Sequence, residues 1–257
     1  MNNNIVIYTC RTGGYDDLLQ PLVVDNSFDY ICFTDNLKEE RRGVWVFREI
    51  PRVIDDKQRL SRYPKMFPHV LLPEYEYSVY IDANILIQNQ AFYEYLKQGI
   101  EKDYSLAGIK HPFRQCTYEE YFAVFYSLKE INAKQLKQEY NLLKEAGFPK
   151  NYGMYEANII FRKHGVDHIE EQCEEWWRLF LRYTKRDQLS YAYTLWKRSI
   201  PFCFLMPSCG IQATSKDPYK VVLHATHLNL KKKAMYVLFS LVPKRWVEAA
   251  FYYYLSH

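Results

Sequence analysis

Residues 78–84 read Ser-Val-Tyr-Ile-Asp-Ala-Asn and indicate a buried strand that ends on two oxygen-bearing side chains. Valine, tyrosine and isoleucine favour strands, and the apolar run resumes at residues 85–87. Asp82 and Asn84 are two residues apart, so they share one face of a strand, and a turn there would aim both at a single ion. An ordinary Asp-Ala-Asn turn between two strands is the alternative, because Asp and Asn favour turns.

Strand-like and helix-like segments alternate along the rest of the chain. Further strands are predicted at 5–9, 30–33, 44–47, 105–109, 157–161 and 221–223. Helices are predicted at 16–24, 54–70 with breaks at Pro64 and Pro68, 91–98, 117–146, 167–183 and 186–197. This order predicts an α/β fold with a mostly parallel central sheet flanked by helices. Ligands bind at the carboxyl edge of such a sheet, which is where Asp82 and Asn84 would lie.

Composition and charge narrow the class of protein. The 257 residues can form one large domain, and only 9 glycines argue against a glycine-rich phosphate loop. Six scattered cysteines without a CxxC spacing, together with the absence of a visible signal peptide, predict reduced thiols and a cytoplasmic protein. Aromatic residues make up 17% of the chain, which suits a sugar-stacking or membrane-interface surface as well as a core.

The positive charge gathers at the carboxyl terminus. Residues 231–257 carry five basic side chains and one acid, whereas residues 1–230 are neutral overall. The apolar runs in this tail are shorter than the roughly 20 residues that span a bilayer. A basic, aromatic-rich segment instead suits docking on an anionic membrane, so we expect a domain at 1–230 and a membrane-associating helical tail at 231–257. Nucleic acid is not an expected partner, because the body is neutral, and packing of the tail on a partner subunit stays open.

Several motifs together carry a resemblance to a known family. They are Tyr-Thr-Cys-Arg-Thr-Gly-Gly-Tyr-Asp at 8–16, Cys-Phe-Thr-Asp at 32–35, Pro-Lys at 64–65, the 80–84 stretch, His-Pro-Phe-Arg-Gln-Cys-Thr-Tyr-Glu-Glu at 111–120, Glu-Ala-Asn at 156–158 and Arg-Asp-Gln at 186–188. Over residues 4–228 the chain resembles the glycosyltransferase-like family of plant mucilage and pectin glycosyltransferases, which has bacterial members in surface-polysaccharide loci. It is more distantly similar to family 8 glycosyltransferases of the GT-A fold.

The resemblance implies a nucleotide-sugar site. Thr9, Arg11 and Asp35 would hold the nucleoside, although Asp35 also fits an Asx-turn. Asp82 and Asn84 would bind Mn²⁺ or Mg²⁺, with Asn84 where relatives carry a second aspartate, so metal binding would be weaker. A late histidine completes the metal site in family 8. His224 and His227 both qualify; we favour His224 and keep His227 as a phosphate or metal contact.

Other polar residues are assigned by position and charge. Arg62 and Lys65, in a basic segment, would neutralise the diphosphate of the donor. His111 and Arg114 follow a strand end and would contact the sugar or the acceptor.

Thr117 and Glu120 in this segment also fit a capping box at the start of a helix, which is the structural alternative to a role in binding. Glu156 and Asn158 would be costly to bury unpaired, which favours a catalytic role. The resemblance places Asp187 and Gln188 on the hydroxyls of the transferred sugar, and Asp187 also suits a helix cap.

These features predict a glycosyltransferase of the hexosyltransferase type. It would transfer a sugar from a nucleotide donor, expected to be UDP-linked, to a hydroxyl acceptor in glycan or surface-polysaccharide synthesis. The acceptor would be a glycan or lipid-linked glycan, and the protein would sit peripherally on the inner face of the cell membrane. A metal-dependent nucleotide-sugar hydrolase and a non-catalytic nucleotide-sugar-binding protein are the alternatives.

Overall fold

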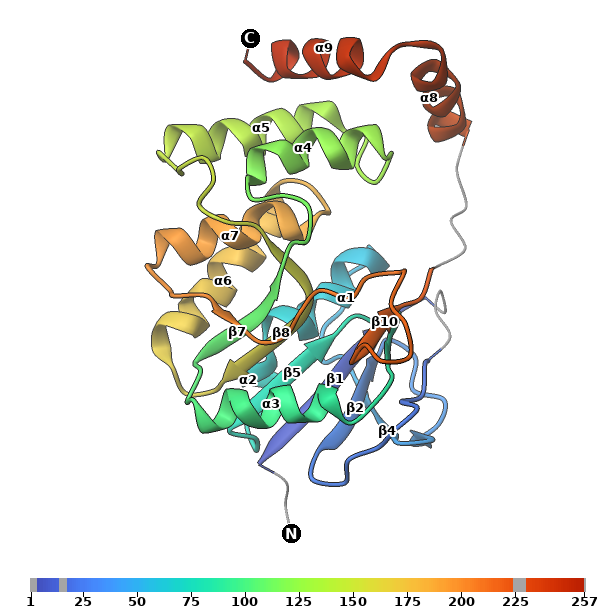
Figure 1. Ribbon diagram of the computed structural model, residues 1–257, viewed down its shortest axis with the longest axis vertical. Coiled ribbons are helices and arrows are strands. Elements are labelled where there is room, and N and C mark those ends of the chain that lie inside the picture. The colour runs from blue at the N-terminus through green and yellow to red at the C-terminus, as the bar shows by residue number, and fades with distance from the viewer. Residues whose placement is uncertain (1–3, 14–17, 224–229, 257) are drawn as a thin grey trace.

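The computed structural model describes residues 4–13, 18–223 and 230–256. Its centre is an eight-stranded sheet in the order β3-β4-β2-β1-β5-β8-β7-β9 (Figure 1). The strands are β1 (Ile5–Arg11), β2 (Asp29–Thr34), β3 (Arg41–Arg42), β4 (Trp45–Glu49), β5 (Tyr77–Ile81), β7 (Leu106–Lys110), β8 (Tyr155–Lys163) and β9 (Cys203–Phe204). Strands β4, β2, β1 and β5 run parallel, and β8 is antiparallel to both β5 and β7. The predicted α/β fold with a mostly parallel sheet is confirmed.

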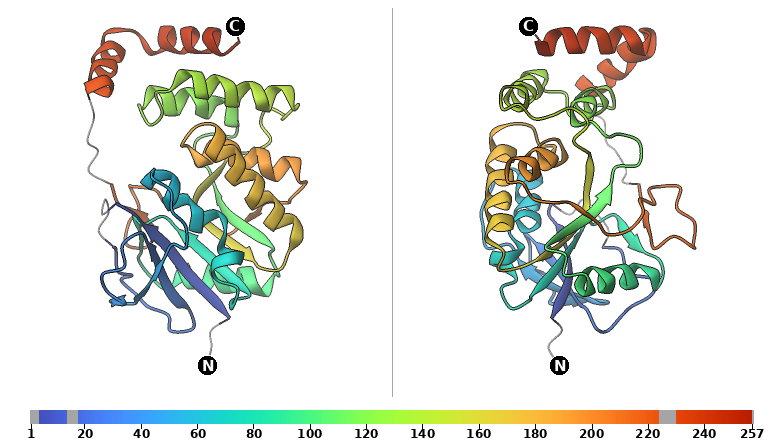
Figure 2. Two further views of the ribbon diagram at one scale, coloured as in Figure 1. Left: turned by 180° about the vertical axis from the view of Figure 1, so that it is seen from behind. Right: turned by 60° about the vertical axis from the view of Figure 1, so that its left-hand side comes forward.

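Helices cover both faces of the sheet. Helices α1 (Lys57–Met66), α2 (Pro68–Leu71), α6 (Asp167–Arg182) and α7 (Asp187–Lys197) lie on one side, and α3 (Ala91–Glu101) lies on the other (Figure 2). Side chains alternate along β1, so Val6 and Tyr8 pack toward α1 and α6 whereas Ile5 and Ile7 pack toward α3. The sheet is therefore buried on both faces, as a parallel sheet requires.

A short second sheet lies beside the carboxyl end of β5. Strand β6 (Ile85–Ile87) pairs antiparallel with β10 (Tyr219–Val221), so two segments more than 130 residues apart meet directly after Asp82. The amide nitrogen of the Asn84 side chain donates to the carbonyl of Val222 at 3.0 Å, and the Val222 N–H donates to the Asn84 carbonyl at 2.8 Å. Residue 84 thereby fixes the end of β10 against the edge of the main sheet.

The prediction of one helix over 117–146 is wrong, because two helices occupy this segment. Helix α4 (Thr117–Tyr126) ends before Leu128, whose φ of 58° is left-handed, and α5 (Ala133–Glu145) begins after Asn132. The Asn132 side chain accepts the N–H of Gln135 and caps the new helix. The apolar periodicity continues across this turn, which is why the sequence pattern concealed it.

The prediction of a helix over 16–24 is wrong for residues 18–24, which are irregular. Tertiary hydrogen bonds take up their backbone groups: the Leu22 N–H donates to the Ile87 carbonyl at 3.0 Å, and the Trp45 indole donates to the Leu19 carbonyl at 2.9 Å. These contacts satisfy backbone hydrogen-bonding groups of this segment without a helix.

The carboxyl-terminal segment forms two helices, α8 (Leu230–Leu241) and α9 (Lys244–Ser256). Helix α9 packs on α4 and α5, burying Phe251 and Leu255, so the four helices form a layer beyond α7 (Figure 1). Within the part of the chain that the structure describes, no helix combines the length and apolar character needed to cross a bilayer.

Candidate functional site

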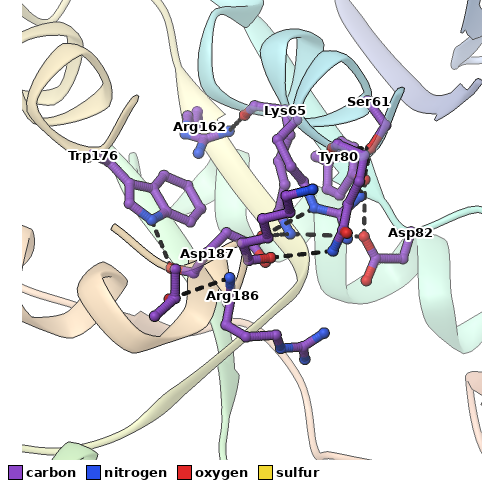
Figure 3. Close-up of polar contacts among 12 residues, drawn as sticks. Ser61, Lys65, Tyr80, Asp82, Arg162, Trp176, Arg186 and Asp187 are labelled. Atoms are coloured by element: carbon purple, nitrogen blue, oxygen red, sulfur yellow. Dashed lines mark hydrogen bonds and ion pairs between the residues drawn. The ribbon is translucent and has the colours of Figure 1, made fainter. Parts of the chain in front are cut away.

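Lys65 lies at the centre of the candidate site. Its side chain is 1% exposed, and its ammonium group lies 2.5 Å from Asp187 Oδ2 and 3.7 Å from Asp82 Oδ1 (Figure 3). Helix α1, which presents it, begins where the Asp56 carboxylate accepts the backbone N–H groups of Gln58 and Arg59. Near the other end of the helix, the buried Arg162 guanidinium donates to the Lys65 carbonyl at 3.0 Å. One buried cation therefore joins carboxylates from β5 and α7.

The Asp187 carboxylate is paired with two cations and does not cap helix α7. Arg186 occupies the cap position, and its side chain makes no capping hydrogen bond. Burial would raise the pKa of the Asp187 carboxyl, but Lys65 and Arg62 hold it well below its usual range. The Arg62 Nε atom lies 3.5 Å from Asp187 Oδ2. The carboxylate is therefore ionised and locks two cations at the sheet edge.

Asp82 stands at the carboxyl end of β5, as predicted. Its backbone N–H donates to the Asn158 carbonyl at 2.8 Å, and the Tyr80 hydroxyl donates to its Oδ1 at 2.8 Å. The Asp82 side chain stays 29% exposed, in contrast to the buried Lys65. Asp82 is therefore both positioned and accessible, which a ligand-binding carboxylate requires.

Glu156 and Asn158 adjoin Asp82 from the neighbouring strand β8. The Asn158 amide lies 3.3 Å from Glu156 Oε2, and the Ser208 hydroxyl donates to the same oxygen at 3.2 Å. Burial raises the pKa of the Glu156 carboxyl, although these hydrogen bonds oppose the rise, and the charge of Asp82 adds to it. A carboxyl group with a raised pKa beside a second carboxylate can exchange protons nearer to neutral pH.

A second group of residues lies at the ends of β1 and β2. The Asp35 carboxylate accepts the Gly13 N–H at 3.1 Å and lies 2.9 Å from the Lys57 ammonium group. Burial would raise the pKa of Asp35, but the Lys57 and Gly13 hydrogen bonds lower it. Burial raises the pKa of the Cys10 thiol, and the charges of both Asp35 and Asp82 contribute to that rise. Since β1 pairs in parallel with both β2 and β5, Asp35 and Asp82 lie at the same edge of the sheet.

The two other predicted nucleoside residues differ in accessibility. Thr9 is 1% exposed, and its hydroxyl has no hydrogen-bond partner within the described chain. Arg11 is half-buried, and its Nε atom is likewise buried without a partner in the described residues. Their contact with a nucleotide stays a prediction.

His111 and Arg114 form a separate cluster beyond the end of β7. The His111 Nδ1 atom accepts the backbone N–H groups of Phe113 and Arg114, at 3.2 and 3.0 Å, which fixes the loop. Burial lowers the pKa of His111 to about 4, and nearby Arg114 and Lys129 contribute. The ring is therefore neutral at pH 7.

The capping box read from Thr117 and Glu120 is wrong. The Thr117 hydroxyl has no partner in the described part of the chain, and Glu120 instead pairs with Arg114. Burial raises the pKa of the Glu120 carboxyl against the charges of Arg114, Lys129 and Arg186. Three cations thus surround one buried glutamate.

Arg186 connects the two clusters; it belongs to the Arg-Asp-Gln motif but was not predicted as a site residue. Its charge acts on both Asp187 and Glu120, and its Nε atom is buried with no partner among the described residues. Figure 3 shows its side chain directed away from the Lys65–Asp187 pair. The sequence signal that could have indicated a functional role for Arg186 was its position directly before Asp187. Gln188, on the same helix, is half-buried.

The donor set at Asp82 fits a hard cation. The Asn84 amide nitrogen is engaged with Val222, which leaves its oxygen as the available ligand atom, and the Asn158 side-chain oxygen is buried without a partner in the described chain. Carboxylate and amide oxygens suit Mg²⁺ or Mn²⁺. His224 and His227 lie outside the described residues; within those, no three His, Cys, Asp or Glu side chains cluster as a metal site.

A cavity of about 460 Å³ lies elsewhere in the molecule. It is lined by Asp29, at the start of β2, and by Val44, Val46 and Tyr75. This is the amino end of β2, opposite the edge that carries Asp35 and Asp82. It therefore does not contribute to the candidate site.

Comparison with known proteins places the chain in a family. Residues 1–214 match the model of the TOD1/MUCI70, glycosyltransferase-like domain. The chain belongs to the TOD1/MUCI70 family. No curated protein matches it. Among solved structures, this TOD1/MUCI70 chain is similar to mouse xyloside xylosyltransferase 1 in its apo form, at 9% identity and a TM-score of 0.42, covering 79% of this chain and 84% of that one.

The family description supports a glycosyltransferase activity for the chain. The match spans both clusters around Lys65 and Glu120 and ends five residues before β10. Every candidate site residue in the described part of the chain therefore lies within the matched TOD1/MUCI70 domain.

Proposed function

We propose that this chain transfers a sugar from a UDP-linked donor to a hydroxyl of a glycan or lipid-linked glycan, in surface-polysaccharide synthesis. The GT-A architecture and the hexosyltransferase type are part of this proposal. One observation carries it: an accessible carboxylate, Asp82, ends a central strand beside the buried cation Lys65, in a chain of a glycosyltransferase-like family. This is the edge at which α/β sheets bind nucleotides.

The residues of the site divide into roles. Arg62, whose contact with Asp187 is longer than that of Lys65 (3.5 Å against 2.5 Å), would neutralise the departing diphosphate. Lys65 has its ammonium group committed to two carboxylates, so it positions Asp82 and Asp187 rather than binding phosphate. Asp35, which retains free acceptor capacity, would accept from the base or ribose. Glu156 would exchange a proton with the acceptor hydroxyl.

A divalent ion would be held by the oxygens of Asp82 and Asn84. We propose Mn²⁺ or Mg²⁺, with His224 or His227 as a further ligand. Val222, which is bonded to Asn84, lies two positions before His224 in the sequence, which supports this proposal. When bound, the ion would supply positive charge to the diphosphate leaving group.

The proposed setting is the cytoplasmic face of an anionic membrane, reached through the basic tail. Exposed aromatic and basic side chains on α8 and α9, among them Tyr236, Trp246 and Arg245, support this placement.

The test measures release of UDP from a panel of UDP-sugars, with Mn²⁺ and with and without glycan acceptors. We expect acceptor-dependent release that is lost in Asp82→Ala and retained in Asp55→Ala, which alters an exposed carboxylate. UDP release at the same rate with and without an acceptor would instead identify a hydrolase. Binding of nucleotide sugars with no turnover on any acceptor would identify a binding protein.

A further inference from the structure

Helices α4, α5, α8 and α9 surround a second cavity, of about 360 Å³. Its walls are apolar and largely aromatic, and include Phe125 of α4, Ala133 of α5, Phe239 of α8, and Trp246 and Phe251 of α9. Two of the rings, Phe125 and Phe251, stack with centroids 4.7 Å apart. Apolar walls of this kind suit an apolar ligand. The volume of the cavity is within the range of ligand pockets.

The cavity adjoins an exposed apolar surface. Leu238 and Trp246 line it and are nevertheless 55% and 61% exposed. Leu241 and Tyr253, on the same two helices, are 76% and 67% exposed. An apolar surface of this kind marks a docking site.

Cations accompany this surface. The Lys137 ammonium group lies 4.9 Å from the ring centroid of Tyr254, which lines the cavity. The Lys244 ammonium group lies 5.6 Å from the Tyr126 ring, and the Arg245 guanidinium lies 5.9 Å from the Trp246 ring. Glu248 is the single acid in residues 231–257. The charge around the cavity therefore suits an anionic head group with an apolar chain.

We propose that this cavity binds one fatty-acyl chain of an anionic membrane phospholipid, whose phosphate lies beside Lys244 and Arg245 at the start of α9. The proposal deepens the membrane docking proposed above and rests on it. A second copy of the chain is a poorer occupant. At a two-fold interface the same patch meets itself, so these cations would face one another.

The filling variant Ala133→Phe provides the sharpest test. Ala133 belongs to α5, so enlarging it fills the cavity without changing any apolar or basic residue of the tail. Ala249→Phe is the matched control, because this exposed residue of α9 is not part of the lining. Ala250→Phe, which fills the cavity from α9, serves if the first variant fails to fold.

The readout is quenching of tryptophan fluorescence by phosphatidylglycerol vesicles brominated on the acyl chains. A Trp246→Phe variant identifies the share of the signal due to Trp246. We expect strong quenching of Trp246 in the unmodified protein, a several-fold loss in Ala133→Phe, and no change in Ala249→Phe. Equal quenching in both variants would overturn the cavity assignment.

Co-sedimentation with unlabelled vesicles separates the two proposals. If Ala133→Phe still binds phosphatidylglycerol vesicles but its fluorescence is no longer quenched, the result supports an acyl-chain site in the cavity. The membrane docking proposed above would then be unaffected. Equal binding to phosphatidylcholine vesicles would contradict the anionic head group. A dimer in solution that shields Trp246 from a soluble quencher would show that a second copy covers the surface, and would overturn the proposal.

Discussion

The Lys65 ammonium group lies 2.5 Å from Asp187 Oδ2, and these two side chains are 1% and 6% exposed. Such a buried pair is costly to break, because the remaining charge has lost both its partner and its water. Lys65 also faces Asp82, so a single side chain supports the two carboxylates of the candidate site.

Lys65→Met should lower the free energy of unfolding by about 3 kcal/mol, since the buried Asp187 carboxylate then keeps only the longer contact with Arg62, at 3.5 Å. Urea unfolding followed by circular dichroism measures the change. Lys97→Met is the control: its pair with Asp25 is exposed on the lysine side, so we expect a loss of about 0–1 kcal/mol. The double variant Lys65→Met/Asp187→Leu should recover part of the loss. If the Lys65 and Lys97 variants lose equally little, the buried pair does not stabilise the site.

Asn84→Asp should tighten Mn²⁺ binding several-fold, because it adds a negative charge to an oxygen ligand. The new carboxylate cannot donate to the Val222 carbonyl, so the metal-free variant should be less stable by about 1–3 kcal/mol. Calorimetric titration and thermal unfolding with and without MnCl₂ measure both effects. Asn151→Asp, at an exposed turn with a φ of 59°, should change neither. Unchanged Mn²⁺ affinity in Asn84→Asp would remove Asn84 from the metal site.

The contribution of Glu139 to stability should fall with rising pH, whereas His111, whose pKa burial lowers, contributes in the opposite direction. Burial raises the pKa of this carboxyl from 4.5 to about 8, although a hydrogen bond from Thr184 at 2.7 Å opposes the rise. Between these values the unfolded chain has lost the proton and the folded chain retains it. Each pH unit in that window therefore costs about 1.4 kcal/mol, and the contribution is fully present only below pH 4.5.

Glu139→Gln should remove this dependence, and Glu145→Gln, at an exposed position of the same helix, should keep it. Urea unfolding between pH 5 and 8 gives the slopes. Parallel slopes for the wild type and Glu139→Gln would show that another group titrates.

Arg186→Ala should raise the KM for donor or acceptor about tenfold, the loss of one charged hydrogen bond. Its effect on stability should be small, because within the described residues its side chain donates no hydrogen bond that would be lost. Lys185→Ala is the matched control, since the neighbouring lysine pairs with Asp56 at the surface. Steady-state kinetics and thermal unfolding separate the two effects. A large fall in stability with unchanged KM would make Arg186 a structural residue.

The sequence predicted most of the sheet because buried strands carry strong local signals. Val79, Tyr80 and Ile81 indicated β5, and the carboxyl edge followed from the order of the elements. The two wrong helices failed for tertiary reasons: Leu22 bonds to Ile87 across the fold, and Asn132 caps a helix that no apolar break announces.

The site was predicted in its residues but not in its connections. The sequence indicated Lys65, Asp82 and Asp187 separately, yet not that the lysine would be buried between the other two. Arg186 was part of a quoted motif but received no role, because its environment depends on Glu120, 66 positions away in the chain.

The Asn84–Val222 contact sets a practical limit on truncation. The TOD1/MUCI70 match stops at residue 214, but β10 lies beyond it and supplies the partner of β6. A protein shortened to the matched region would leave β6 without its partner strand and the Asn84 amide without its acceptor. Exposed strand edges recruit other chains, so such a fragment should aggregate. The smallest expressible unit therefore extends at least through Val222.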